Sequence, residues 1–450
     1  MNALQQHPQE RTRDLVYGVG KTGLSIARYL RRQGRDALYV DSRPAPPGLA
    51  ELQTIAPQAE LVLGPLPDGL LKDVTRIIVS PGISDQDALL EEARRTGVDI
   101  VSDIELFVEE ARAPFIAVTG SNGKSTVTTL LALMCNAAGR RALAGANLGE
   151  PALDLLAEPV PDIYVLELSS FQLQRTRHLP ARVAVLLNIS ADHLDWHRSE
   201  AEYREAKYRV LREADAVVIN RVDAESRERI SAGQTCRSFA LNEPRRQNYG
   251  IVDKDGASWL ARGDDALLPT ASMKLVGSHN QENALAALAA GDLLGLDMAA
   301  MLGVLTTFTG LPHRMQFVAR RNDVTFINDS KATNVAAAIA SVNSLDGKVV
   351  LIAGGQGKGG DFASFADAVH ERLRGLIVIG EDAPLIERAF AGRAELQHAP
   401  SLVAAVDIAA ATAQPGDTVL LAPACASFDQ FSNYLQRGDT FCAAVEALGE

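Results

Sequence analysis

The sequence predicts an α/β protein of three domains in series, each a largely parallel sheet with flanking helices. Short apolar, β-branched runs alternate with helix-forming segments along most of the chain, which is typical of strand–helix–strand units. Polar or glycine-rich clusters follow many of these runs, at the strand ends where open parallel sheets bind their ligands. At 450 residues, the chain is long enough for two to four domains with sizeable cores.

The composition is that of a globular protein and argues against two kinds of partner. Hydrophobic residues make up 47% of the chain and charged residues 22%. The formal net charge of −12 argues against general binding to nucleic acids or to anionic membranes. If the substrates are anionic, basic residues must therefore be gathered locally.

We expect neither a signal peptide nor a membrane span. Residues 1–13 are polar and rich in glutamine. The most apolar helical stretch, 284–305, is interrupted by Asp292, Gly295 and Asp297. The four cysteines are far apart and include no C-x-x-C pair, which fits a reducing compartment rather than a disulfide framework or a zinc site. These features predict a cytoplasmic protein.

Residues 1–105 are predicted to form a first, Rossmann-like domain that binds a phosphorylated ligand. A strand at 15–17 runs into a glycine-rich turn at 18–23, and a second strand, 37–40, ends in Asp41. This spacing matches a dinucleotide-binding fingerprint, although the same geometry would hold the diphosphate of any nucleotide. A third strand, 76–79, leads into the turn Ser80-Pro81-Gly82. The residues expected at the ligand are Val19, Gly20, Lys21, Thr22, Ser42, Arg43, Ser80, Pro81 and Gly82.

Residues 106–312 are predicted to form a P-loop-type domain organised around a phosphate-binding loop. A buried strand at 115–118 precedes the loop, and a helix-forming segment follows it. Backbone N–H groups and a helix N-terminus favour phosphate there, the lysine supplies a positive charge, and a hydroxyl can reach Mg²⁺. The loop residues, which we predict to bind ATP, are Gly120, Ser121, Asn122, Gly123, Lys124, Ser125 and Thr126.

Two more strands of this domain end in polar groups. The strand 163–166 ends in Glu167, which is well placed to hold Mg²⁺ beside a phosphate loop; the alternative is a solvated carboxylate at a strand end. The strand 183–187 ends in a polar turn that contains His193, and a further strand is expected at 216–219.

Residues 313–450 are predicted to form a third, Rossmann-like domain. Its expected strands are 325–327, 349–353, 376–379 and 418–421. Three polar or glycine-rich clusters follow the first, second and last of them, at 328–334, 354–360 and 422–429. The segment 308–314 has the turn chemistry of a linker before this domain.

Six motifs together resemble one known family, the ATP-dependent Mur ligases of peptidoglycan synthesis. In chain order they are TGSNGKST, LELSSFQL, NISADHLD, HNQENALAA, GLPHR and NDSKATN, and they span nearly the whole chain. DSKATN and PACASFDQF resemble the branch that adds glutamate to UDP-N-acetylmuramoyl-L-alanine (below, the UDP-sugar). The resemblance implies that ATP phosphorylates the L-alanyl carboxylate, and that the amine of D-glutamate attacks the acyl phosphate. It also implies a monomer.

The resemblance assigns catalytic and metal-binding roles that the residues alone do not show. It implies two Mg²⁺ ions, one held by Ser125 and Glu167 and the other by Glu167 and His193. Lys207 resembles a carbamylated lysine, which would act as an oxygen ligand. The implied catalytic residues are Lys124, Glu167, His193 and Lys207.

The resemblance also implies contacts with the three substrates. The further ATP contacts are Asn280, Asn283, Arg314, Asp329 and Lys331, the further UDP-sugar contacts are Asn147, Gln172 and His193, and the glutamate pocket is Thr333, Lys358, Ser427 and Tyr434. Arg314 and Lys331 lie on or beyond the linker, so the last domain must close over ATP to use them. The chain departs from the family's pattern at Ala146, where relatives have glycine, and at Gln356, Ser432 and Tyr434 near the glutamate pocket.

Three alternatives stay open from the sequence. A family member could ligate another amino acid, or L-glutamate, because stereochemistry depends on the shape of the pocket. An NAD-dependent oxidoreductase would explain Gly18, Gly20, Gly23 and Asp41 but none of the later motifs. The third alternative is a nucleotide-binding regulator that closes on ATP without catalysing a reaction.

Overall fold

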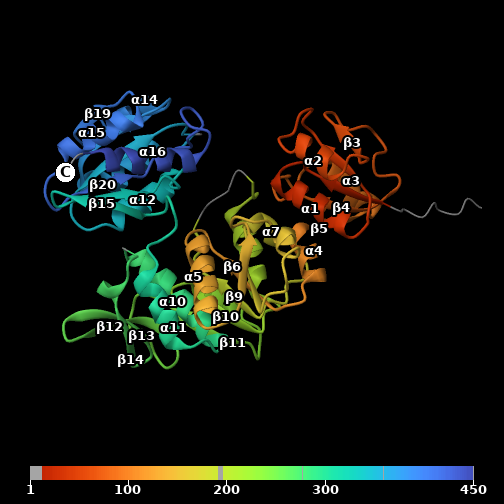
Figure 1. The fold of residues 1–450 in the computed structure, drawn as a ribbon, viewed down its shortest axis with the longest axis horizontal. Coiled ribbons are helices and arrows are strands. Elements are labelled where there is room, and N and C mark those ends of the chain that lie inside the picture. Colours follow the sequence, from red (N-terminus) through yellow and green to blue (C-terminus); the bar gives the residue numbers. More distant parts are fainter. Residues whose placement is uncertain (1–12, 191–195, 276, 358, 449–450) are drawn as a thin grey trace, which may run out of the picture. The chain divides into compact units, whose positions relative to one another are not determined.

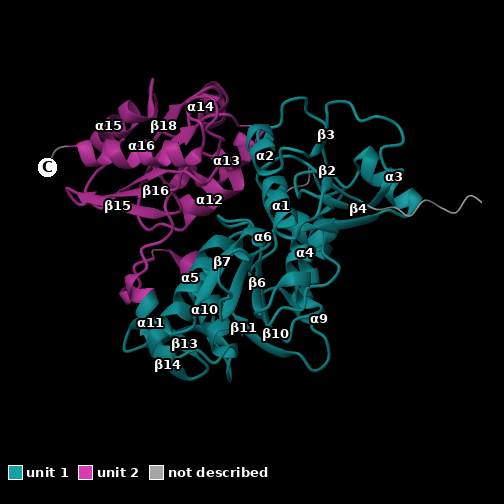
Figure 2. Ribbon diagram, turned by 45° about the vertical axis from the view of Figure 1, so that its right-hand side comes forward, with its two compact units in different colours: residues 1–269, 282–304 teal, residues 270–281, 305–450 magenta. Residues whose placement is uncertain are grey.

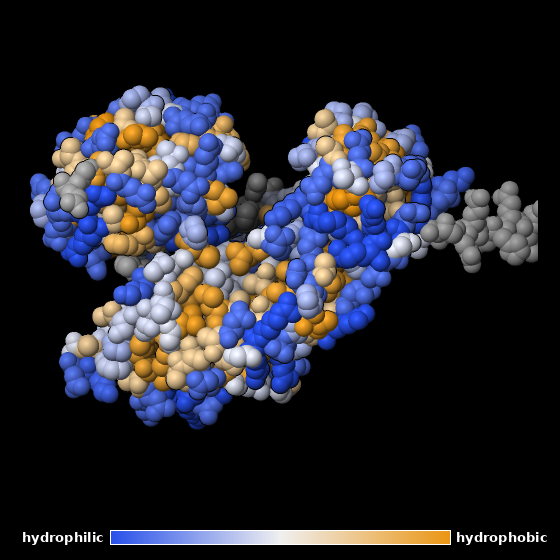
Figure 3. All heavy atoms as spheres, in the orientation of Figure 1, coloured by the Kyte–Doolittle hydropathy of each residue, from blue (hydrophilic) through white to orange (hydrophobic). Residues whose placement is uncertain are grey.

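The computed structural model describes residues 13–190, 196–275, 277–357 and 359–448. These residues form three largely parallel sheets with flanking helices, which confirms the predicted fold class (Figure 1). Within the described ranges, no helix is long and apolar enough to span a membrane. On the face drawn in Figure 3, hydrophilic and hydrophobic residues are interspersed.

The first sheet has five parallel strands in the order β3-β2-β1-β4-β5. The sequence predicted the three central strands and missed β3 and β5, which lie at the two edges. The strands are β1 (Arg13–Tyr17), β2 (Ala37–Asp41), β3 (Glu60–Leu63), β4 (Val74–Val79) and β5 (Asp99–Ser102). The helices are α1 (Lys21–Arg32), α2 (Leu49–Ile55), α3 (Ala88–Thr96) and α4 (Asp103–Glu110).

The second sheet has nine strands in the order β14-β13-β12-β11-β10-β9-β6-β8-β7, parallel from β12 to β7 and antiparallel across β12, β13 and β14. Its strands are β6 (Phe115–Thr119), β7 (Ala142–Ala146), β8 (Ile163–Glu167), β9 (Val183–Leu186), β10 (Ala216–Asn220), β11 (Thr235–Phe239), β12 (Tyr249–Lys254), β13 (Ala257–Arg262) and β14 (Asp265–Pro269). Its helices are α5 (Lys124–Ala137), α6 (Ala152–Leu155), α7 (Ser170–Arg175), α8 (Glu200–Tyr208), α9 (Ala224–Glu228), α10 (Ser278–Leu293) and α11 (Met298–Thr307). The sequence predicted β6, β8, β9 and β10 but not the other five strands.

The third sheet has six strands in the order β15-β16-β20-β17-β18-β19, of which only β15 is antiparallel to its neighbour among the described strands. Its strands are β15 (Gln316–Arg321), β16 (Val324–Asn328), β17 (Val349–Gly354), β18 (Leu373–Ile379), β19 (Leu396–His398) and β20 (Thr418–Leu421). Its helices are α12 (Val335–Asn343), α13 (Phe362–Val369), α14 (Ala383–Phe390), α15 (Leu402–Thr412) and α16 (Tyr434–Ala447). Here the sequence missed the edge strands β15 and β19.

The chain divides into two compact units, coloured separately in Figure 2. Unit 1 contains the residues up to Pro269 together with Glu282–Val304, and unit 2 contains Thr270–Gln281 and the residues from Leu305 onward. The predicted domain boundaries after residues 105 and 312 stay predictions.

A continuous hydrophobic core joins the first two sheets inside unit 1. It includes Ile78 and Val101 of the first sheet and Leu166 of the second. Phe107 of α4 packs edge-on against Phe115 and Tyr164, with ring centroids 6.2 and 5.0 Å apart. The ligand turns of the first sheet are therefore anchored to the sheet that carries the phosphate loop.

Candidate active site

The glycine-rich loop between β6 and α5 is held by the segment that follows β9. The Asn188 carbonyl accepts a hydrogen bond from the Ser121 amide at 2.8 Å, and the Asn188 side-chain oxygen accepts one from the Asn122 amide at 2.8 Å. The Ser121 hydroxyl donates to the Ser190 carbonyl at 3.0 Å. These contacts fix the path of the loop backbone.

The loop ends in a glycine whose conformation and surroundings exclude a side chain. Gly123 has a φ of 84°, and a Cβ there would lie 2.2 Å from Oδ1 of Asn283 in α10. Lys124 opens α5 and donates from Nζ to the carbonyls of Gly120 and Ser121, at 2.9 and 2.8 Å. Thr126 is half-buried in the same first turn. A compact turn, a helix N-terminus and a lysine together favour the phosphates of a nucleotide.

Three predicted residues meet at the end of β8. Glu167 is 2% exposed, and its Oε2 accepts a hydrogen bond from the Ser125 hydroxyl at 2.6 Å. Its Oε1 accepts one from Nδ2 of Asn147 at 2.5 Å. Ala146, before this asparagine, has a φ of 75°, a left-handed conformation that glycine adopts more readily than alanine. The buried carboxylate thus links the phosphate loop to the turn after β7.

Ser125 and Glu167 fit a magnesium ion, because a carboxylate and a hydroxyl are oxygen ligands suited to a hard cation. Among the residues that the structure describes, no three His, Cys, Asp or Glu side chains gather into a metal-binding group. His193, the other implied ligand, lies outside the described residues.

Lys207 is buried beside the phosphate loop. It lies in α8, is 2% exposed, and donates from Nζ to the Gly120 carbonyl at 2.8 Å. The same nitrogen lies 4.8 Å from the ring centroid of Tyr203, whose hydroxyl is 2.7 Å from the Ser121 hydroxyl. The structure therefore brings this predicted residue to the first glycine of the loop.

In the first domain, the acidic residue of the glycine fingerprint, Asp41, already accepts hydrogen bonds from other groups of the protein. Asp41 is 2% exposed and accepts hydrogen bonds from the backbone amides of Val19, at 2.8 Å, and Arg43, at 3.0 Å. The Arg43 guanidinium donates to both Asp41 oxygens, at 2.8 and 2.7 Å. Burial acts to raise the pKa of Asp41, but the hydrogen bonds outweigh it and lower the pKa to about 2. A carboxylate engaged in this way is poorly available for the ribose of NAD, which counts against the oxidoreductase alternative.

The glycines of this turn have different tasks. A Cβ on Gly23 would lie 2.0 Å from the Gly18 carbonyl, so this pair serves close packing, whereas a Cβ on Gly20 would meet nothing within 4 Å. The Ser80 hydroxyl donates to the Gly18 carbonyl at 3.1 Å and joins the two predicted ligand turns. The other predicted contacts of this domain lie on or beside these turns: Lys21, Thr22, Ser42, Pro81 and Gly82.

Gln172, an implied UDP-sugar contact, is engaged at the start of α7. Its Oε1 accepts a hydrogen bond from the Ser169 backbone amide at 3.1 Å. Its backbone amide donates to the Ser169 hydroxyl at 3.2 Å, which completes a capping box. Its Nε2 lies 3.5 Å from Oδ2 of Asp103.

Asp329, one of the implied ATP contacts in unit 2, is a buried carboxylate. Asp329 accepts hydrogen bonds from the Met315 amide, at 3.2 Å, and from the Ser341 hydroxyl. Burial raises the pKa of Asp329, against the hydrogen bonds and the charge of Arg314, which lower it. Asn280, which is 5% exposed, belongs to the same unit.

The described residues of the implied glutamate pocket are Thr333 in the turn after β16, Ser427 in the turn after β20, and Tyr434, the first residue of α16. Nζ of Lys331 lies 4.3 Å from the ring centroid of Tyr434, and the Thr333 amide donates to the Lys331 carbonyl at 2.7 Å. Ser427 is 2% exposed and follows Ala426, whose backbone exchanges two 2.9 Å hydrogen bonds with Gln356. Lys358 lies outside the described residues.

Sequence reasoning missed a buried arginine that fastens two of these turns. Arg437 of α16 is 1% exposed and donates to the hydroxyl and carbonyl of Ser330, at 3.0 and 2.9 Å. It also donates to the Cys425 carbonyl at 3.1 Å, and burial lowers its pKa to about 10. A signal was present in the sequence, because Arg437 occupies the helical stripe of Phe441 and Val445, where a cation is unusual.

Three family models match consecutive parts of the chain. The Mur ligase MurD-like N-terminal domain matches residues 12–102, the Mur ligase middle domain matches 118–291, and the Mur ligase glutamate ligase domain matches 313–425. The chain is 48% identical over 438 residues to the UDP-N-acetylmuramoylalanine--D-glutamate ligase of Pseudomonas aeruginosa, covering 96% of this chain and 98% of the relative. The Legionella pneumophila enzyme of the same name is 46% identical over 441 residues, covering 96% and 99%.

Solved structures share the fold at lower identity. A pseudomurein peptide ligase type C from Methanothermus fervidus and a UDP-N-acetylmuramate-alanine ligase from Thermotoga maritima each superimpose with a TM-score of 0.60 at 18% identity. Each match covers 97% of this chain and 100% of the other. At this identity the likeness concerns the fold alone, and it agrees with the three α/β sheets.

Proposed function

The chain belongs to the Mur ligase family, and we propose that it joins D-glutamate to UDP-N-acetylmuramoyl-L-alanine at the expense of ATP. Relatives nearly half identical over almost the full length carry this activity in their names. The last part of the chain also matches a glutamate ligase domain. The product is a precursor of peptidoglycan.

The single observation that carries the proposed chemistry is the cluster of Ser125, Asn147 and Glu167 beside the phosphate loop. An oxygen of the L-alanyl carboxylate takes the γ-phosphoryl group of ATP, and ADP leaves. The glutamate amine then attacks the acyl carbon and loses a proton, the acyl C–O bond breaks, and inorganic phosphate leaves. Phosphoryl transfer needs charge neutralisation and positioning more than covalent help. Lys124, folded over the loop, supplies positive charge, and Asn147 orients the carboxylate of Glu167.

Two Mg²⁺ ions complete this site in our proposal, one held by Ser125 and Glu167 and the other by Glu167 and His193, with a carbamylated Lys207 as a further ligand. When bound, the ions would neutralise charge on the phosphoryl oxygens. The proximity of Lys207 to the first glycine of the loop supports its role, because a carbamate there would add two oxygens beside the phosphates.

The glutamate pocket is proposed to lie in unit 2, at Thr333, Lys358, Ser427 and Tyr434. A lysine and hydroxyls suit the two carboxylates of glutamate, because charge-assisted hydrogen bonds both hold and orient them. Two contacts stabilise the structure near these residues. One is the contact of the Lys331 ammonium with the Tyr434 ring, and the other is the antiparallel bridge between Gln356 and Ala426. We further propose a cytoplasmic monomer that acts on small molecules, without nucleic acid or membrane partners.

Phosphate release from ATP tests the proposal. The purified chain is given Mg²⁺ and ATP with the UDP-sugar, and D-glutamate and L-glutamate are offered separately. We expect phosphate release and an amide product only with the UDP-sugar and D-glutamate together. Equal turnover with L-glutamate, or with another amino acid, would redirect the specificity. Hydride transfer to NAD in place of phosphate release would favour the oxidoreductase alternative.

A further inference from the structure

A buried arginine of the second sheet holds the turn that follows β4 in the first sheet. Arg175 is the last residue of α7, and its side chain is 5% exposed. Its Nε donates to Oδ1 of Asp85 at 2.8 Å, and its Nη1 donates to the Ser80 carbonyl at 3.1 Å. Its Nη2 donates to the Ile83 carbonyl. One guanidinium therefore binds three acceptors along six residues of the first domain.

The segment that Arg175 holds is the Ser80-Pro81-Gly82 turn, where the UDP-sugar is expected. The Ser80 carbonyl also accepts the Ile83 amide at 3.1 Å, which closes the turn, and the Ser80 hydroxyl reaches the Gly18 carbonyl. A Cβ on Gly82 would meet nothing within 4 Å, so the outer side of the turn is open to a ligand. The guanidinium thus binds two backbone carbonyls of the turn, and these hydrogen bonds set the direction in which the carbonyls point.

Arg175 is itself fixed from the second sheet. Its guanidinium carbon lies 5.8 Å from the ring centroid of Trp196, which packs on Phe171 with centroids 4.5 Å apart. Burial lowers the pKa of Arg175, while the charge of Asp85 opposes this shift. A buried cation with planar donors and fixed acceptors is a rigid support, since the fork geometry is already set before binding.

We infer that Arg175 is a positioning residue for the UDP-sugar, which acts by holding the backbone of the 80–83 turn in its binding shape. The inference rests on the proposed function. It also means that residues 1–105 alone do not fix the shape of the 80–83 turn, although every residue of the turn lies within them. Removing Arg175 would leave the Ser80 and Ile83 carbonyls without their charged donor, and the turn would lose its fixed shape before the ligand arrives.

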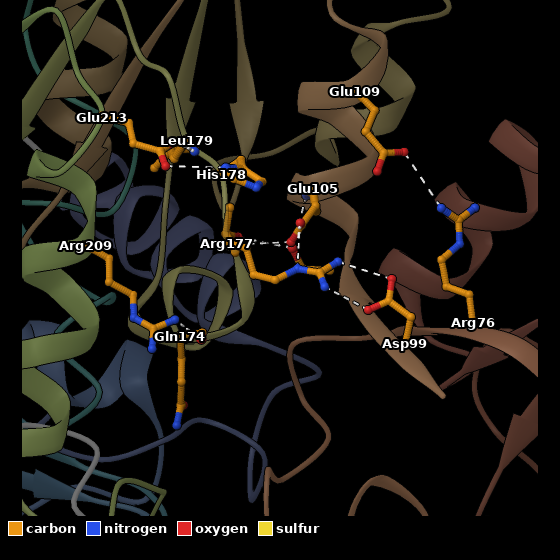
Figure 4. Close-up of polar contacts among 12 residues, drawn as sticks. Arg76, Asp99, Glu105, Glu109, Gln174, Arg177, His178, Leu179, Arg209 and Glu213 are labelled. Carbon is orange, nitrogen blue, oxygen red and sulfur yellow. Dashed lines mark hydrogen bonds and ion pairs between the residues drawn. The ribbon is translucent and has the colours of Figure 1, made fainter. Parts of the chain in front are cut away.

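Arg177, two residues further on, offers a matched control. It crosses between the same two sheets, donating from Nη1 to Asp99 at 2.8 Å and from Nε to Glu105 at 2.9 Å (Figure 4). Its side chain is 53% exposed, and its ion-pair partners among the described residues are Asp99 and Glu105, both outside the 80–83 turn. A variant of this residue weakens the same junction without touching the ligand turn.

The test measures UDP-sugar binding by calorimetry, without ATP, in the full chain and in R175A, R175K and R177A. We expect R175A to raise the Kd by about tenfold or more, and R175K to fall between it and the native chain, because a lysine keeps the charge but loses the fork. R177A should change the Kd less than about twofold. In steady-state assays, the KM for the UDP-sugar should rise in the Arg175 variants while the KM for ATP stays near native.

Native UDP-sugar affinity in folded R175A would overturn the inference. So would an equal loss of affinity in R177A, because general loosening of the junction would then explain both. If calorimetric unfolding shows that R175A does not fold, the test relies on R175K instead. A native Kd for the UDP-sugar in R175K would then overturn the inference. A native chain that fails to bind the UDP-sugar at all would instead overturn the proposed function.

Discussion

Asp103, the first residue of α4, is a carboxyl group in an unfavourable place. It is 3% exposed, its Oδ1 has no hydrogen-bond partner among the described residues, and its Oδ2 lies 3.5 Å from Nε2 of Gln172. Burial raises the pKa of Asp103 to about 6, although the Gln172 amide and backbone amides of α4 favour the charged form. We predict that Asp103→Asn stabilises the protein at neutral pH.

The magnitude and the sign follow from the pKa difference between the folded and unfolded states. The unfolded value is 3.8, so the shift of about 2 pKa units corresponds to about 3 kcal/mol. Because the folded state holds the proton more tightly, stability falls as the pH rises from about 4 through about 6 and stays low above that. Asp103→Asn should therefore add up to about 3 kcal/mol at pH 8 and have little effect near pH 4.

Calorimetric unfolding of the full chain tests the predicted stabilisation at a pH of about 4.5 and a pH of about 8, near the two ends of the titration. We expect the variant to unfold several degrees higher at pH 8 and near the native midpoint at the lower pH. Asp41→Asn is the control of opposite sign, because the pKa of Asp41 is lowered to about 2 and its carboxylate stabilises the fold above pH 4 (roughly its unfolded pKa). A destabilised Asp103→Asn at pH 8, or the same shift at both pH values, would refute the reasoning.

The remaining predictions concern catalysis, stability and domain closure. Lys124→Ala should lower kcat/KM by roughly a thousandfold or more while leaving the unfolding profile intact, and near-native turnover would contradict the ATP assignment. Arg437→Ala should destabilise unit 2 by about 3–5 kcal/mol in urea unfolding, because three buried acceptors lose their donor; a loss below about 1 kcal/mol would count against that role. Lys207→Ala should lose activity and regain part of it with a small carboxylic acid, whereas an unmodified amine in the mass spectrum of active enzyme would exclude the carbamate. Nucleotide and UDP-sugar together should change the small-angle scattering profile if Arg314 and Lys331 close over ATP, and superimposable profiles would argue against closure.

The central strands and the ligand turns were predictable because their signals are local. β20 occupies the predicted 418–421, and β6, β8 and β17 differ from their predicted ranges by one residue. These strands are buried throughout, so their sequences are continuous apolar runs. The glycine turns depend on spacing and backbone freedom, which are also written locally, as the φ of Gly123 shows.

The edge strands escaped prediction for the opposite reason. β3 has the sequence ELVL and β19 has LQH, and most of their residues are half-exposed or exposed. A strand with only one neighbour needs no continuous apolar run, so its composition resembles that of a loop. These segments form strands because they pair with the neighbouring strand of the sheet. The β12–β13 hairpin was missed although Asp255-Gly256, at φ values of 56° and 75°, is a strong turn signal.

The sequence by itself therefore determined the central strands, the phosphate loop and the family, and tertiary structure decided which cations hold the ligand turns. In the sequence, Arg175 looks like an ordinary charged helix residue, and the apolar stripe around Arg437 indicates burial without identifying its hydrogen-bond partners. Their acceptors on Ser80 and Ser330 lie 95 and 107 positions away along the chain. A guanidinium becomes a structural support only when water is excluded and its donors meet fixed oxygens, and both conditions arise from packing between distant segments.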